Sequence, residues 1–207
     1  PGIKRVCERS LELAGMNTGD IGCFDFYSCF PIAVGLALDE LNIDANDSRG
    51  VTVTGGLPFA GGPGNNYVTH SIAATVDRIR SGQAKTGLVT ALGWYITKHA
   101  AGIYCAEEPP RAFARDDGME WEKSGAASTS IRIVEEAGGD ASIETYTVIH
   151  DRSGEPSDAI VIGRLDDGSR FFSRAPKEAY AAMEREEFIG RRGTVKVVDG
   201  FNLFQPR

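Results

Sequence analysis

The chain has 207 residues, of which 42% are hydrophobic and 25% are charged, a composition typical of a globular protein. This length allows one large domain or two small ones. The formal net charge of −7 argues against nucleic acid or an anionic membrane surface as the main partner. Since no apolar stretch approaches the roughly 20 residues of a membrane-spanning helix, we expect no transmembrane segment and no signal peptide.

The four cysteines are Cys7, Cys23, Cys29 and Cys105. They show neither a CxxC pair nor the spacing of a metal finger, so no metal site is predicted. In a chain of this size, they favour reduced thiols in the cytoplasm over a disulfide framework. A helix-like segment follows Pro1 almost at once, and we expect the chain to be part of a longer polypeptide.

The first half of the chain alternates between helix-like and strand-like segments. The periodicity predicts helices over 3–14, 31–41 and 66–80. Gly15 and Gly82 are expected to end the first and third of these helices, and Pro31 to open the second. Strands are expected over 20–27, 51–54, 87–92 and 103–106. This order predicts a layered α/β unit.

A glycine-rich run occupies residues 55–66, between the expected strand 51–54 and the helix that follows. Its five glycines permit positive φ angles and close approach of a ligand to the backbone. Amides at the start of the next helix could hold a phosphate or a developing oxyanion. An inert loop is equally compatible with the run. It has neither the Gly-Lys-Ser/Thr ending of a nucleotide-binding loop nor the GxGxxG spacing of a dinucleotide fold.

The pattern changes after residue 106. Residues 107–124 are rich in charge and proline and are predicted to be a linker. Strands are then expected over 128–135, 142–150, 159–165, 169–173, 193–198 and 201–204, with a helix over 176–188. A tight turn is expected at residues 166–168. Short strands with one helix favour a small β-barrel of the OB type, beginning near Gly125.

Residues 1–106 resemble the C-terminal half of a thiolase. Tyr27-Ser28-Cys29-Phe30 takes the place of the motif Asn-Glu-Ala-Phe, which is His-Asp-Cys-Phe in the sterol-carrier type. The glycine run takes the place of the Gly-His-Pro loop, and Ala91-Leu92-Gly93-Trp94 that of the Cys-x-Gly motif. The resemblance implies a thiolase half with helix, sheet and helix layers.

The resemblance also implies a chemistry. Thiolases make or break a carbon–carbon bond beside a coenzyme A thioester, using a nucleophilic cysteine from the N-terminal half. The histidine of Gly-His-Pro activates that cysteine, and the cysteine of Cys-x-Gly moves the α-proton. Here Gly62 replaces the histidine, Leu92 replaces the second cysteine, and Tyr27 replaces the first residue of its motif. Ordinary thiolase turnover is therefore not expected.

The layout as a whole resembles thiolase-like proteins of type 1, which carry an additional C-terminal domain. Such chains are nominally acetyl-CoA acetyltransferases, that is, acyltransferases of lipid metabolism. We accordingly predict a thiolase-like core over 1–106, a linker over 107–124 and an additional OB-like domain over 125–207.

The resemblance points to a small set of candidate site residues. His99 could be a relocated base or a surface histidine. Tyr27 could donate to a thioester carbonyl, and Cys29 could be a reactive thiol or a small packed residue. Asn66 and its neighbour could cap the following helix. Coenzyme A contacts are expected from four loop residues: Gly61, Gly62, Gly64 and Asn65.

Three functions remain open from the sequence. The first is an acyl-CoA-handling enzyme that carries out acyl transfer or retro-aldol cleavage. The second is a non-catalytic coenzyme A-binding or scaffold subunit. The third is nucleic-acid binding by the barrel. It is disfavoured because residues from Gly125 onward hold 11 Lys and Arg against 14 Asp and Glu. We expect an acyl-CoA ligand and no covalent cofactor. The expected partners are the missing N-terminal half and a protein at the barrel.

Overall fold

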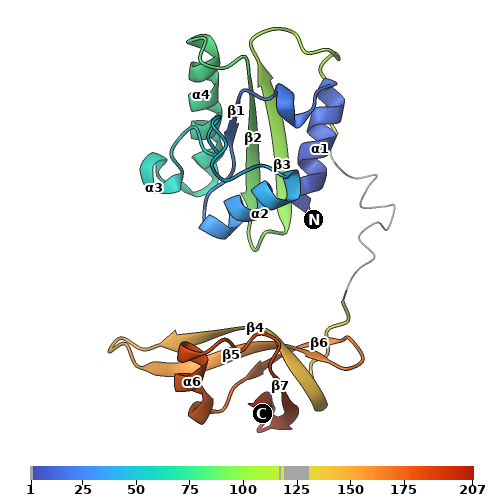
Figure 1. Ribbon diagram of the computed structural model, residues 1–207, viewed down its shortest axis with the longest axis vertical. Coiled ribbons are helices and arrows are strands. Elements are labelled where there is room, and N and C mark those ends of the chain that lie inside the picture. The colour runs from blue at the N-terminus through green and yellow to red at the C-terminus, as the bar shows by residue number, and fades with distance from the viewer. Residues whose placement is uncertain (1, 117, 119–130) are drawn as a thin grey trace. The chain divides into compact units, whose positions relative to one another are not determined.

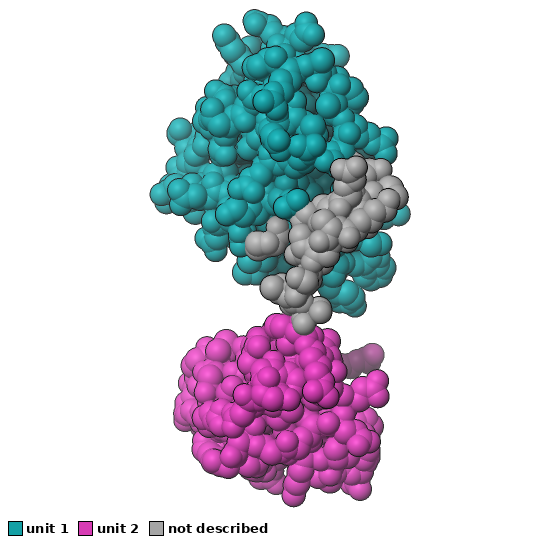
Figure 2. All heavy atoms as spheres, turned by 90° about the vertical axis from the view of Figure 1, so that its right-hand side faces the viewer, with its two compact units in different colours: residues 1–119 teal, residues 120–207 magenta. Residues whose placement is uncertain are grey.

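The computed structural model describes residues 2–116, 118 and 131–207. The chain divides into two compact units, Pro1–Met119 and Glu120–Arg207 (Figures 1 and 2). Each unit buries its own hydrophobic cluster. Residues 117 and 119–124 of the predicted linker, and residues 128–130 of the predicted strand 128–135, lie outside the described residues. The described part of that strand makes only an isolated bridge, between Ile133 and Arg170.

A three-stranded sheet forms the centre of the first unit. Its strands are β1 (Cys23–Asp25), β2 (Thr86–Gly93) and β3 (Lys98–Cys105), in the order β1-β2-β3. β1 runs parallel to β2, whereas β3 runs antiparallel to it. β1 is shorter than the predicted strand 20–27. At its start, Asp20 belongs to the short helix η1 (Thr18–Asp20), and after its end the amides of Phe26 and Tyr27 donate to the Val51 carbonyl and the Thr90 hydroxyl. β3 is longer than predicted and begins at Lys98.

Helices cover both faces of this sheet, as the layered prediction requires (Figure 1). α1 (Gly2–Ala14) and α2 (Pro31–Leu41) share a core with Leu88 on one face. α4 (Tyr67–Arg80) places Val68 and Ile72 beside Val89 on the other face. The short helices α3 (Leu57–Ala60) and η2 (Gly64–Asn66) lie in the glycine run.

The predicted strand over 51–54 is wrong. The carbonyl of Val51 accepts one hydrogen bond from the Phe26 amide at 3.0 Å, so this segment lies beside the residues that come directly after β1. Further along, the amide and the hydroxyl of Thr54 both donate to the Asp25 carboxylate, each at 3.0 Å. Side-chain hydrogen bonds take the place of a strand ladder here, and no strand forms.

The second unit is a closed five-stranded barrel, in agreement with the predicted OB-like domain. Its strands follow the order β4-β5-β6-β8-β7. They are β4 (Gly139–His150), β5 (Pro156–Leu165), β6 (Arg170–Arg174), β7 (Arg192–Val198) and β8 (Phe201–Pro206). The turn at 166–168 joins β5 to β6. The predicted helix over 176–188 is shorter in the structure, as η3 (Lys177–Ala179) and α6 (Tyr180–Arg185).

Phenylalanine rings fill the interior of the barrel. Phe171 and Phe204 are completely buried, with ring centroids 6.5 Å apart. A Cβ atom added to Gly163 would lie 2.2 Å from the Phe171 ring, and one added to Gly193 would lie 2.5 Å from the Phe204 ring. Glycine is therefore required at both positions for the rings to fit.

Asn202 closes the barrel between β6 and β8. Its side-chain amide donates to the carbonyls of Glu135 and Phe172 at 2.8 Å and accepts from the Ala137 amide at 2.9 Å. These bonds are needed because β6 and β8 pair at a single position, Arg174 with Leu203. A buried side chain thus provides hydrogen bonds that the ladder does not.

Candidate functional site

A cavity of about 530 Å³ opens on the first unit beside the start of α2. The segment after β1, the first turn of α2, the end of β2 and the β2–β3 turn all contribute to its walls. The lining residues are mostly aliphatic and aromatic: Tyr27, Cys29, Phe30, Ile32, Ala33, Leu92, Trp94, Tyr95 and Ile96. A concave, apolar cavity with few polar groups is the usual form of a small-molecule site.

Two of the predicted site residues, Tyr27 and Cys29, line this cavity. The Tyr27 amide donates to the Thr90 hydroxyl at 2.9 Å, and the Tyr27 ring packs edge-on against Tyr67, with centroids 5.3 Å apart. Burial, with smaller contributions from Cys29 and Tyr67, raises the pKa of the Tyr27 phenol. At neutral pH this phenol is protonated, so it is a hydrogen-bond donor and not a general base.

The β2–β3 turn has an unusual backbone. Trp94 has a φ of 47° and Ile96 a φ of 60°, although neither is glycine. A left-handed φ is a genuine outlier for a β-branched residue such as Ile96. The turn also exposes two large rings, since Trp94 is 78% and Tyr95 is 87% accessible. The side chains of all three residues line the cavity.

His99, the predicted base, does not line the cavity. It pairs with Leu92 across the β2–β3 ladder, and its ring lies against Gly2 at the start of α1. Its Nε2 is 3.0 Å from the carbonyl oxygen of Ile96, and its Nδ1 is buried without a hydrogen-bond partner among the described residues. A histidine that donates from Nε2 to this carbonyl supports the turn from outside the cavity.

The four predicted coenzyme A-binding residues, Gly61, Gly62, Gly64 and Asn65, are exposed and lie outside this cavity. The loop that carries them is held at its start by the Leu57 amide, which donates to the Ser28 hydroxyl at 3.2 Å. It is held further along by His70, whose Nδ1 is 2.9 Å from the Ala60 carbonyl oxygen. The structure thus separates the predicted residues into a cavity pair and a loop group.

The predicted cap on α4 is absent. Asn66 occupies the N-cap position, but its side chain makes no capping bond. Its Oδ1 instead accepts from the Thr69 hydroxyl at 2.7 Å.

A buried carboxylate that sequence reasoning missed connects the loop to the sheet. Asp25 is completely buried at the end of β1 and accepts from the Ser71 hydroxyl at 2.6 Å. The Thr54 bonds described above approach its other oxygen, and the Thr54 hydroxyl lies 2.7 Å from that of Tyr67. Asp25 therefore fixes the position at which the glycine run leaves the sheet.

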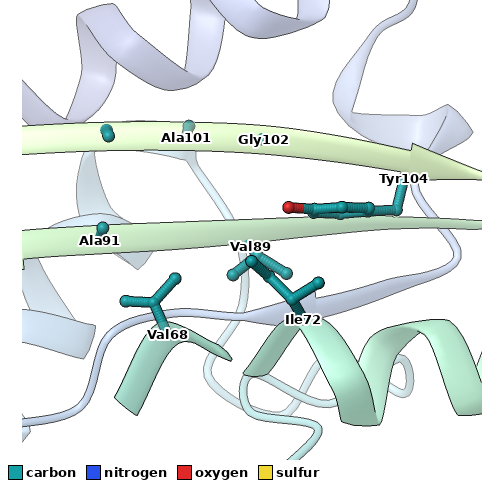
Figure 3. Close-up of a pocket in the computed structure, with 8 residues that line it drawn as sticks. Val68, Ile72, Val89, Ala91, Ala101, Gly102 and Tyr104 are labelled. Carbon is teal, nitrogen blue, oxygen red and sulfur yellow. The ribbon is translucent and has the colours of Figure 1, made fainter. Parts of the chain in front are cut away.

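A second, smaller hollow of about 190 Å³ lies on the opposite face of the sheet. Figure 3 shows Val68 and Ile72 of α4 facing Val89 and Ala91 of β2, with the Tyr104 ring alongside. Gly102 lines the hollow on the neighbouring strand, next to the Tyr104 ring. This groove is apolar, and α4 covers only part of the sheet face.

Comparison with known proteins bears on both units. Residues 124–200 match the family described as thiolase-like protein type 1 additional C-terminal domain. The whole chain is similar to a monomeric SCP2-thiolase-like protein type 1 from Mycobacterium smegmatis, known from its crystal structure. The TM-score is 0.86 and the sequence identity 36%, over 97% of this chain. This chain is a member of the thiolase superfamily. The predicted resemblance is thus confirmed.

This thiolase-superfamily chain spans 44% of the length of the mycobacterial protein. No curated protein matches its sequence. Within the described residues, no helix combines the length and the apolar character needed to cross a membrane.

The motif positions of this thiolase-superfamily chain lie in different places. Tyr27 and Leu92 meet in the large cavity, whereas Ala91 faces the smaller groove and Gly62 is exposed on the loop. None of these four side chains can accept a proton at neutral pH. Sequence reasoning missed Trp94 and Ile96 as cavity residues, although two adjacent aromatic residues after a strand-ending glycine were a usable signal.

Proposed function

We propose that this chain is the C-terminal part of a thiolase-like acyl-CoA protein that holds an acyl thioester without ordinary thiolase turnover. One observation carries the proposal. The cavity formed where the family motifs meet contains no histidine, carboxylate or lysine among its described lining residues. A site of this kind can bind and orient an acyl group, but it lacks the base that carbon–carbon bond chemistry needs.

The polar groups near the cavity have distinct roles in this proposal. The protonated phenol of Tyr27 donates a hydrogen bond to the thioester carbonyl; the Thr90 hydroxyl holds the Tyr27 backbone, and the Tyr67 ring packs against the Tyr27 ring. The loop residues Gly61 and Gly64 let the polar part of coenzyme A lie directly against the backbone, while their own amides donate to the carbonyls of Leu57 and Gly62. Support comes from their open surroundings, since a Cβ atom at either would meet nothing within 4 Å.

We further propose that a polypeptide carrying the N-terminal half of a thiolase is the partner of this unit. Support comes from the apolar groove between α4 and β3 and from the 44% span of the mycobacterial relative (Figure 3). Any nucleophilic cysteine would belong to that half. The four cysteines here are unpaired, which supports the cytoplasmic location that we propose.

The test is calorimetric titration of acetyl-CoA and decanoyl-CoA into the complete polypeptide. We expect saturable binding that weakens at least tenfold in a Gly64→Phe variant. Gly82→Phe is the matched control, because Gly82 also has a positive φ and open surroundings but lies at the far end of α4. Equal weakening by both substitutions would show that backbone strain, and not ligand contact, is the cause.

A second measurement separates binding from catalysis. Incubation with acetoacetyl-CoA and free coenzyme A should yield no acetyl-CoA above the buffer rate. Measurable thiolysis that survives removal of contaminating thiolase would contradict the claim of lost turnover. Binding of no acyl-CoA at all would instead favour a scaffold subunit, the alternative that the missing catalytic groups also permit.

A further inference from the structure

The β2–β3 turn and the cavity beneath it determine which acyl group fits. We propose that the cavity takes a bulky, uncharged acyl group, and that the turn residues Trp94, Tyr95 and Ile96 are the specificity-determining residues. This inference rests on the proposed function, because it takes an acyl-CoA as the ligand.

The size of the cavity is the first argument. A volume of about 530 Å³ lies within the range of roughly 300–1,000 Å³ that holds drug-sized ligands. An acetyl group occupies on the order of two water volumes of about 30 Å³ each. An acetyl group would therefore leave most of the apolar surface of the cavity in contact with water, whereas a long or ring-containing acyl group would cover it.

The chemistry of the walls is the second argument. Among the described lining residues, polar side-chain atoms are limited to the thiol of Cys29, the hydroxyls of Tyr27 and Tyr95, and the indole N–H of Trp94. None of these can neutralise a buried carboxylate or phosphate. Burying an unpaired charge is expensive, so the walls select against dicarboxylic acyl groups. The phenol of Tyr27 suits the one polar atom that every acyl thioester has, its carbonyl oxygen.

The conformation of the turn is the third argument. Backbone outliers such as those of Trp94 and Ile96 are strained and persist only where surrounding structure enforces them. The contact of His99 Nε2 with the Ile96 carbonyl and the bond from the Ile96 amide to the Trp94 carbonyl provide that enforcement. This backbone conformation leaves two large rings exposed to water at the rim of an apolar cavity. An apolar ligand that covers the rings would remove this unfavourable exposure.

The arrangement of the two rings favours contact with a ligand over contact with each other. The centroids of Trp94 and Tyr95 are 6.0 Å apart with planes inclined at 36°, so their faces are not stacked. Each ring can therefore lie against an acyl chain that leaves the cavity between Phe30 and the turn.

The experiment uses Trp94 as a fluorescent reporter in the complete polypeptide. The chain has a second tryptophan, Trp121, which Trp121→Phe removes so that its emission does not interfere. Free coenzyme A and acetyl-, hexanoyl- and decanoyl-CoA are titrated in turn. Because each buried methylene contributes about 0.8 kcal/mol, we expect decanoyl-CoA to bind at least about 100-fold more tightly than acetyl-CoA, with a blue shift of the Trp94 emission.

Two variants test the walls by calorimetry. Leu92→Trp fills the cavity and should abolish the preference for decanoyl-CoA over acetyl-CoA. Ile96→Gly relieves the left-handed φ and removes a wall, and should reduce the same preference at least tenfold. Phe59→Ala is the control, because Phe59 is 83% exposed on α3 and lies outside the cavity lining. Circular dichroism establishes that each variant is folded.

The outcomes distinguish this inference from the proposed function. If acetyl-, hexanoyl- and decanoyl-CoA bind equally well, the acyl selectivity is refuted while acyl-CoA binding stands. If sodium decanoate shifts the Trp94 emission but no acyl-CoA binds, the proposed function is refuted while the apolar cavity keeps its selectivity. If neither decanoate nor decanoyl-CoA affects Trp94 or releases heat, both are refuted.

Discussion

Replacing Asp25 with alanine should destabilise the first unit by about 3–5 kcal/mol. The substitution removes the acceptor of the Ser71 hydroxyl, which is completely buried, of the Thr54 amide and hydroxyl, and of a long bond of 3.5 Å from the Tyr67 hydroxyl. A buried hydroxyl left without a partner costs about 1–3 kcal/mol, and hydrogen bonds to a charged group contribute about 1.5–3 kcal/mol each. Thr54 is only half-buried and can turn to water, and the Tyr67 hydroxyl keeps its contact with the Thr54 hydroxyl, so the total stays below the sum of all four bonds.

A double-mutant cycle localises this effect. Ser71→Ala alone leaves Asp25 with its Thr54 bonds and should cost only about 1–2 kcal/mol. In the Asp25→Ala background, Ser71→Ala should cost almost no further stability, because it removes the buried hydroxyl that the first substitution left without an acceptor. Asp39→Ala on the exposed side of α2 is the control and should change stability by less than about 0.5 kcal/mol.

The assay is urea denaturation followed by Trp94 emission in the Trp121→Phe background, which reports on the first unit. A shared transition cannot be assumed in a protein with two units, so the second unit is followed separately. If Asp25→Ala unfolds at the same urea concentration as the parent, the network does not stabilise the fold. If the two single-variant effects simply add, Ser71 is not coupled to Asp25.

Three further predictions concern the barrel. Hydrogen bonds from two arginines lower the pKa of Glu144 from 4.5 to about 2, so it stabilises the folded barrel above pH 4.5 and loses that effect as the pH falls towards 2. Acid titration of Glu144→Gln by circular dichroism should lack this loss, and an unchanged acid transition would contradict the assignment. Asn202→Ala leaves backbone groups between β6 and β8 without hydrogen-bond partners and should cost about 2–4 kcal/mol of stability, measured by thermal denaturation. Gln205→Ala, at an exposed position, should cost almost no stability. Gly163→Ala should cost about 1–3 kcal/mol by overpacking, and Phe171→Leu in the same chain should restore part of that stability; a deficit that Phe171→Leu deepens would show that ring contact is not the cause.

The helices of the first unit were predictable because strong local signals mark them. Pro31 opens α2, and apolar residues at helical spacing define α1 and α4. The segment 51–54 was mispredicted because alternating valine and threonine are typical of a strand. In the structure, Thr54 of this segment donates hydrogen bonds to the Asp25 carboxylate, which is distant in the sequence. Strand propensity cannot reveal a competing side-chain acceptor.

The site was predictable where family motifs mark it and not elsewhere. Tyr27 and Cys29 lie in the cavity, as their motif position suggested. The left-handed backbone at Trp94 and Ile96 was not predictable, because neither residue type favours it. His99 was plausible as a base from its sequence neighbours. Only the structure shows that one of its nitrogens supports the turn and that the other faces no partner.

The two glycine–phenylalanine contacts inside the barrel restrict where the second unit can bind anything. The rings of Phe171 and Phe204, together with the Gln205 carbonyl oxygen 2.3 Å from a Cβ atom added to Gly193, leave no room for a methyl group at Gly163 or Gly193. Side chains fill the interior of this barrel, whereas wider eight-stranded barrels can enclose a small ligand. A hydrophobic cargo cannot enter it. Whatever the second unit recognises must be held on its outer strands or loops, where Phe172 and Phe201 remain exposed.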